Sequence, residues 1–132
     1  MRNIVSYGAA LVVFLGLDFT WIGFLSQPIY HAQIGPLLLA TFKPVPAVLF
    51  YLLYMAGLVL FVIGPALNQR KWQAAALLGA AFGLVAYATY DLTNLATLRG
   101  FTTTITLVDM AWGAFATAAA STAGYAAARR FD

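Results

Sequence analysis

Residues 45–67 read VPAVLFYLLYMAGLVLFVIGPAL and contain no charged side chain. A helix that crosses the roughly 30 Å hydrocarbon core of a bilayer needs about 20 consecutive apolar residues. This stretch is long enough, and it lacks the alternation of polar and apolar residues that marks a strand of a membrane barrel. We therefore predict that residues 45–67 form a transmembrane helix.

Three further stretches on either side of this segment have a similar length and apolar character. Four helices are therefore predicted, over residues 4–25, 45–67, 72–97 and 103–127. The longest connection, residues 26–44, holds several prolines and an apolar run that is too short to span, so we predict a re-entrant or interfacial loop there. The other loops are short, which makes consecutive helices antiparallel neighbours. The sequence thus predicts one all-α domain over residues 1–132, an integral membrane bundle of four transmembrane helices.

The composition of the whole chain excludes several classes of protein. Of its 132 residues, 63% are hydrophobic and only 8% are charged, and the mean hydropathy is +0.86. About a quarter of the residues of a soluble domain are charged, so a soluble enzyme is excluded, and disorder would need low hydrophobicity. The net charge of +3 comes from scattered bases that form no nucleic-acid-binding patch. The absence of cysteine excludes disulfides and thiolate chemistry.

The basic residues predict the orientation of the bundle. With four spans, both termini and the second loop lie on the same side of the membrane. That side carries Arg2, Arg70, Lys71, Arg129 and Arg130, whereas the opposite side carries only Lys43 and Arg99. Loops rich in lysine and arginine stay in the cytoplasm, so we predict that the N and C termini are cytoplasmic.

The aspartates are the most informative polar residues, because three of the four lie within predicted spans. Asp18 and Asp91 precede the outer ends of their helices by about seven and six residues, and Asp109 follows the outer start of its helix by about six. At a rise of 1.5 Å per residue, all three lie roughly 10 Å below the outer boundary. An unpartnered aspartate within a span costs several kcal/mol, so such residues face the bundle interior or a water-filled cavity. We predict that three helices place their carboxyls in one outward-facing pocket.

Several polar and aromatic side chains fall near the same depth and complete the predicted ligand-binding site. Each tryptophan that follows an aspartate by three residues has an indole N–H able to donate to a carboxylate, and an arginine in the third loop can reach back along its stem. Two tyrosines are candidate proton donors, and the single histidine lies in the outer loop. The predicted site consists of Asp18, Trp21, His31, Tyr87, Tyr90, Asp91, Asn94, Arg99, Asp109 and Trp112.

Two of the aspartates continue stripes of mainly small residues along their helices. One stripe is Ala75, Gly79, Gly83, Tyr87 and Asp91, and the other is Asp109, Gly113, Thr117 and Ser121. Small residues at this spacing allow a neighbouring helix to approach closely, so the acids should point inward. A chain of 132 residues is small for a transporter with its own pathway. The candidate surfaces for contact with a second copy of the chain are Gly79 and Gly83, or an alanine-rich helix face. We therefore expect a homodimer in addition to the bilayer and a small-molecule or lipid ligand as partners.

Three interpretations of the acids remain open. The pocket binds or translocates a small solute, a lipid headgroup or a proton; the protein is a membrane-embedded enzyme or accessory factor in lipid modification, with an aspartate as general acid or base; or it is a structural subunit in which the aspartates only lock helices together. We favour the first, because three carboxyls share a single nearby guanidinium, that of Arg99. No pair of residues has a metal-binding spacing and no nucleotide fingerprint occurs, so neither a metal nor a cofactor is predicted, although His31 and the acids leave a cation site open.

Four stretches of the sequence are similar to a known family. They are LDFTWIG at residues 17–23, IGPLL at residues 34–38, AYATYDLTNLATL at residues 86–98 and DMAWG at residues 109–113. The chain resembles the family of small bacterial four-helix inner-membrane proteins catalogued as the domain of unknown function DUF2177. The resemblance implies a multi-pass protein of the bacterial inner membrane, and it implies no particular activity.

Overall fold

The computed structural model describes residues 2–21 and 44–131, which form helices and the short turns between them. Its elements are α1 (Arg2–Thr20), α3 (Pro44–Leu58), the π-helical turn η3 (Val59–Ile63), α4 (Gly64–Gln69), α5 (Trp72–Thr97), α6 (Thr103–Ala128) and the final turn η4 (Arg129–Phe131). No strand occurs within these two ranges. The all-α prediction is therefore confirmed for the described residues, whereas the predicted loop over residues 26–44 and the end of the first span lie outside them, apart from Pro44.

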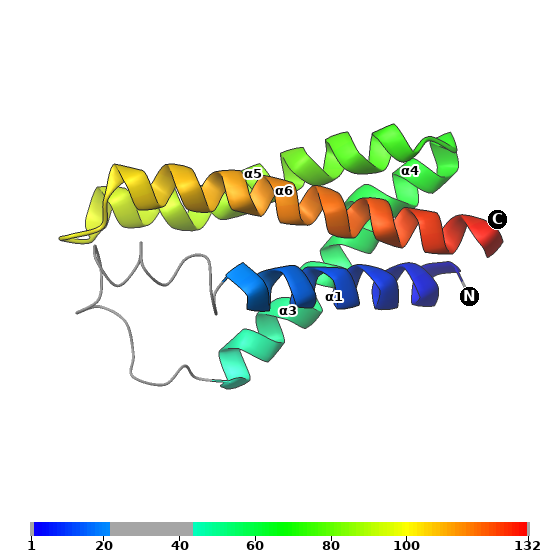
Figure 1. Cartoon of the computed structure of the whole chain (residues 1–132), viewed down its shortest axis with the longest axis horizontal. Helices are drawn as coiled ribbons and strands as arrows, with labels where there is room; N and C mark the ends of the chain where they lie inside the picture. The colour runs from blue at the N-terminus through cyan, green and yellow to red at the C-terminus, as the bar shows by residue number, and fades with distance from the viewer. Residues whose placement is uncertain (1, 22–43, 132) are drawn as a thin grey trace.

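The helices form a bundle in which α6 packs against both α5 and α1 (Figure 1). The helices α5 and α6 run antiparallel, and α3 crosses the bundle obliquely beneath them. Both chain termini lie at the end of the bundle that also holds the turn between α4 and α5, and the turn between α5 and α6 lies at the opposite end. The first and last described helices therefore have their outer ends at the same end of the bundle.

The apolar segment quoted above folds as one long helix with a local irregularity. It begins as α3, widens into η3 and ends as α4, where Gly64 donates its N–H to the carbonyl of Val59 in a π-type bond. The cause is Pro65, which has no N–H and whose ring would clash with the carbonyl four residues earlier. A π turn absorbs such a mismatch without breaking the helix.

The small-residue stripe of α5 packs directly against the stripe of α6. An ideal Cβ placed on Gly79 would lie 2.7 Å from the Oγ of Ser121, and one placed on Gly83 would lie 2.6 Å from the Oγ1 of Thr117. Both glycines are buried within the chain. The expectation that Gly79 and Gly83 face a second copy is therefore wrong, because α6 already occupies that surface.

Two residues, Gly100 and Thr102, determine the turn between α5 and α6. Gly100 has φ +86°, a left-handed conformation that side chains disfavour. Thr102 then caps α6, and its hydroxyl accepts a hydrogen bond from the N–H of Ile105 at 3.2 Å. The turn returns the chain at once, so that α6 packs antiparallel against α5.

Three helical segments are long and apolar enough to cross a membrane: Arg2–Thr20, Val45–Gln69 and Trp72–Thr97. The fourth predicted span is also a helix, but α6 does not reach the same hydropathy within the described residues. The reason lies in its position between α1 and α5, where alanine, glycine, serine and threonine replace large apolar side chains. Ten residues of α6 are buried within the protein. Fewer of its side chains therefore need to be strongly apolar in order to face lipid.

Candidate functional site

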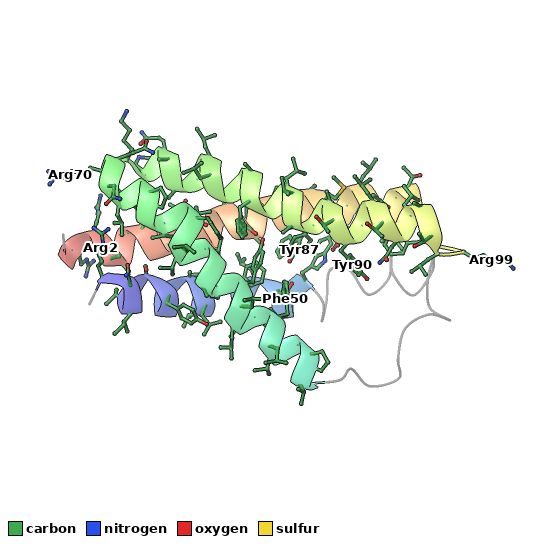
Figure 2. All side chains as sticks on the ribbon, turned by 180° about the vertical axis from the view of Figure 1, so that it is seen from behind. Arg2, Phe50, Arg70, Tyr87, Tyr90 and Arg99 are labelled. Carbon is green, nitrogen blue, oxygen red and sulfur yellow. The ribbon has the colours of Figure 1, made fainter. Side chains whose placement is uncertain are left out.

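One cavity brings the three predicted carboxyls together. Asp18 on α1, Asp91 on α5 and Asp109 on α6 all line a cavity of about 440 Å³. Its remaining lining residues are Trp21, Phe50, Ala86, Tyr87, Tyr90, Phe101 and Ile105. Figure 2 shows Phe50, Tyr87 and Tyr90 in the middle of the molecule, between α3 and the α5–α6 pair. Three helices thus supply one acid each to a wall that is otherwise aromatic and aliphatic.

Asp18 is held by a residue of the second span. The side chain is buried, with 7% of its surface exposed, and the hydroxyl of Tyr51 on α3 donates a short hydrogen bond to its Oδ2. A hydrogen bond to a charged or buried acceptor in a dry interior contributes more than one at a wet surface. Asp18 therefore ties α1 to α3 as well as lining the cavity.

The contribution of the hydrogen bond between Tyr51 and Asp18 to stability should be measurable in a double-mutant cycle. We expect Tyr51→Phe to lower the free energy of unfolding by about 1–3 kcal/mol, because it removes the donor to a buried carboxyl. In an Asp18→Asn background, the same change should cost clearly less, since the charged acceptor is already gone. Thermal denaturation of the four proteins in detergent measures the coupling. Fully additive effects would show that the two side chains do not interact.

Asp91 differs from Asp18 because no described residue donates a hydrogen bond to it. Its side chain is completely buried, and neither carboxylate oxygen has a hydrogen-bond partner among the described residues. The half-buried carboxyl of Asp109 is an electrostatic neighbour of Asp91. Two acids facing each other cannot satisfy one another when both are ionised. Asp91 therefore stabilises no helix contact that the structure describes.

The polar side chains that lie near Asp91 in the sequence do not donate to its carboxyl. Arg99 is exposed and points away from the end of the bundle (Figure 2). Asn94 is half-buried and pairs with the side chain of Tyr90. The hydroxyls of Thr89 and Thr97 donate to carbonyls four residues earlier in their own helix, both at 2.8 Å. Neither Arg99 nor Asn94 is among the residues that line the cavity.

The two tryptophans near the acids stack on each other. The ring centroids of Trp21 and Trp112 are 4.6 Å apart, and the planes differ by 7°. Trp112 lies beside Asp18, but neither indole nitrogen has an acceptor in hydrogen-bond geometry among the described residues. The predicted indole-to-carboxylate bonds are therefore replaced by a stacked pair that joins α1 to α6 at the cavity.

Tyr87 reaches the cavity because its helix neighbour has no side chain. A Cβ on Gly113 would overlap the ring of Tyr87, so the glycine is what lets the ring lie across α6. The electrostatic neighbours of the Tyr87 hydroxyl include Asp18 and Asp109. Of the predicted site residues, Asp18, Trp21, Tyr87, Tyr90, Asp91 and Asp109 line one cavity. His31 lies outside the described residues.

The contribution of the second span was missed in the sequence. Phe50 lines the cavity, Tyr51 binds Asp18, and the hydroxyl of Tyr54 pairs with that of Thr117 on α6 at 2.8 Å. A signal for two of them existed, because the two tyrosines are the only side chains in residues 45–67 that can donate a hydrogen bond. Within the described ranges, no three acidic or histidine side chains cluster as metal ligands do.

Comparison with known families agrees with this architecture. A family model described as "Predicted membrane protein (DUF2177)" matches residues 3–126. The chain belongs to this family. The matched range includes every described residue that lines the cavity of this DUF2177 protein. The match also confirms the resemblance carried by the four stretches quoted above. Searches of the curated proteins and of the solved structures gave no significant match. The family and the apolar helices together indicate a membrane protein with several helices long and apolar enough to span a bilayer.

Proposed function

We propose that this protein binds a small solute in its intramembrane cavity and passes it to or across the membrane. The observation that carries the proposal is the convergence of Asp18, Asp91 and Asp109, from three helices, on one cavity. A volume of about 440 Å³ lies within the range of small-molecule sites, which are mostly apolar with a few convergent polar groups.

The free-energy cost of burying the carboxyl of Asp91 supports a functional rather than a structural role for this residue. A buried carboxyl without a partner is unfavourable inside a bilayer, and ionisable residues in such places mark ligand or ion pathways. Asp18 has a helix-joining contact with Tyr51, whereas Asp91 has no such contact among the described residues. The interpretation that all three acids only lock helices together is therefore weaker for Asp91 than for Asp18.

The membrane topology that goes with this proposal has four spans. Although α6 is less apolar than the other helices, it has 26 residues and packs between two candidate spans. The distribution of basic residues supports a proposed orientation with cytoplasmic termini, in which the turn between α5 and α6 faces outward. In this orientation the solute enters the cavity from the outer side of the inner membrane.

Cysteine labelling tests whether water and solutes reach the cavity. The chain has no cysteine, so single substitutions report without background. Ala86 lines the cavity, and Ala111 on α6 is exposed on the bundle exterior, two residues from Asp109. We expect a cationic, membrane-impermeant methanethiosulfonate to modify Ala86→Cys in proteoliposomes about tenfold faster than Ala111→Cys, because a thiol against lipid stays un-ionised and unreactive.

Mass spectrometry of the intact protein measures the modified fraction over time. Ala111→Cys is the matched control, since it tests the same substitution at a similar level of the bundle. Equal or slower modification at position 86 would contradict a solute-accessible cavity and with it the proposed function.

A further inference from the structure

The cavity wall contains a hydrogen-bond acceptor that no described residue uses. Asp91 lines the cavity and is completely buried, and neither of its carboxyl oxygens has a hydrogen-bond partner among the described residues. A carboxyl oxygen accepts a hydrogen bond whether the group is ionised or protonated. A buried acceptor without a donor has a desolvation cost, and each such group in a folded protein calls for an explanation. A solute that donates a hydrogen bond to Asp91 would remove this cost.

The cavity wall also contains a donor that no described residue uses. Trp21 lines the same cavity, and its indole nitrogen is buried without an acceptor among the described residues. The ring of Trp21 is stacked on that of Trp112, which holds its plane. An indole N–H can only donate, so it requires an acceptor atom on the solute. A solute with a hydroxyl group, or with an N–H beside a carbonyl, carries both a donor and an acceptor.

The rest of the lining favours a flat and uncharged ring. Five of the ten described lining residues are aromatic, and aromatic rings pack well against the edges and offset faces of other rings. Phe50 and Tyr90 line the cavity and are also exposed, so its wall continues into the outer surface of the bundle. A neutral aromatic solute partitions from the bilayer into such a region, whereas a charged solute has a large desolvation cost there.

We infer that the cavity binds an uncharged aromatic molecule with a hydroxyl or N–H group, and that this group donates a hydrogen bond to the carboxyl of Asp91. This inference rests on the proposed function and names its substrate class. Asp18 already accepts a hydrogen bond from Tyr51, so its carboxyl gains less from a donor on the solute. Binding transfers no proton and no electron, and recognition depends on hydrogen bonds and ring contacts alone.

Three naphthalene derivatives, each substituted at the second ring carbon, separate the hydrogen bonds from the ring contacts. Naphthol has an O–H donor, methoxynaphthalene keeps the oxygen only as an acceptor, and ethylnaphthalene has carbon in place of this oxygen. Isothermal titration calorimetry of the purified protein in detergent measures binding, with titrations into protein-free detergent subtracted. We expect naphthol to bind saturably, and about tenfold or more tighter than methoxynaphthalene, because a buried carboxyl is a strong acceptor. Methoxynaphthalene should bind about threefold tighter than ethylnaphthalene.

Asp91→Leu tests the acceptor directly, because leucine branches at the same carbon as aspartate and cannot accept a hydrogen bond. It should weaken naphthol binding by about tenfold or more and leave methoxynaphthalene binding nearly unchanged, since only naphthol donates. Asp91→Val removes the same acceptor with a smaller side chain, so a folding defect in one variant does not end the test. Asp132→Leu makes the same chemical change at the last residue of the sequence and should bind all three probes as the parent does.

Trp21→Phe tests the second contact, because it keeps an aromatic ring and removes the indole N–H. It should abolish the roughly threefold preference for methoxynaphthalene over ethylnaphthalene. Trp72→Phe makes the same change at an exposed residue at the start of α5 and is the matched control. This control should retain both preferences of the parent protein.

The outcomes separate this inference from the proposed function. If Ala86→Cys is reactive but naphthol binds no tighter than methoxynaphthalene, the substrate class is overturned and the solute cavity stands. A preference for naphthol that survives in both Asp91→Leu and Asp91→Val overturns the role of Asp91. A preference for methoxynaphthalene over ethylnaphthalene that survives in Trp21→Phe overturns the role of the indole. If Ala86→Cys is no more reactive than Ala111→Cys, the proposed function itself fails.

Discussion

Gly83→Leu should leave little or no folded protein. At this position α5 and α6 are so close that even an ideal Cβ would lie 2.6 Å from the Oγ1 of Thr117 and 2.7 Å from its Cβ. A leucine side chain would force the two helices apart along their shared stripe. Overpacking of a close contact usually costs about 1–3 kcal/mol, and here it acts on backbone that cannot move aside. Size-exclusion chromatography of the detergent extract should show an aggregate in place of the monodisperse parent peak.

Graded and control variants make this expectation specific. Gly83→Ala should lower the melting temperature without abolishing folding, because only one methyl group must be accommodated. Gly16→Ala is the matched control, since nothing lies within 4 Å of a Cβ at that position on α1. It should be neutral or slightly stabilising, because alanine restricts the unfolded chain more than glycine does. A Gly83→Leu protein that melts like the parent would contradict the described α5–α6 contact.

Asp91→Leu should make the protein more stable. The carboxyl of Asp91 is buried without a hydrogen-bond donor, so an apolar side chain relieves a desolvation cost instead of breaking a contact. We expect the free energy of unfolding to rise by about 1–3 kcal/mol. The cavity beside Asp91 gives the larger side chain room. The melting temperature of the variant and of the parent protein in detergent measures this effect.

Asp18→Leu is the contrasting variant, because Asp18 accepts a hydrogen bond from Tyr51. Its removal leaves a buried hydroxyl without a partner, so we expect the melting temperature to fall. If Asp91→Leu destabilises the protein as much as Asp18→Leu does, Asp91 is part of the structural framework and the argument for its functional role fails.

The sequence was sufficient to predict the parts of this fold that depend on local pattern. Apolar length predicted four spans, and three of them are helices long and apolar enough to cross a membrane. The four-residue spacing of small residues predicted the packed face of α5. The spacing of Asp18, Asp91 and Asp109 from their helix ends also predicted that the three lie together, because helix rise is constant. These predictions needed only the geometry of a single helix.

Features that depend on how helices meet could not be predicted in this way. The partner of Asp18 is Tyr51, which lies on a span with no other polar signal than its tyrosines. The tryptophans stack on each other instead of donating to acids, and Gly83 faces α6 instead of a second copy. All three contacts depend on the rotation of each helix about its own axis. This rotation cannot be derived from the length of a helix or from its depth in the membrane.

The sheltered position of α6 has a consequence for the biogenesis of the protein. This helix follows α1, α3 and α5 in the chain and is less apolar than the candidate spans, so the bilayer alone favours its insertion less than theirs. On the four-span topology, we expect it to insert only when its packing partners are already in the membrane. Asp109 reaches the membrane with α6, so the three acids cannot line one cavity before α6 has inserted. The cavity is thus completed only when α6 packs against α1 and α5.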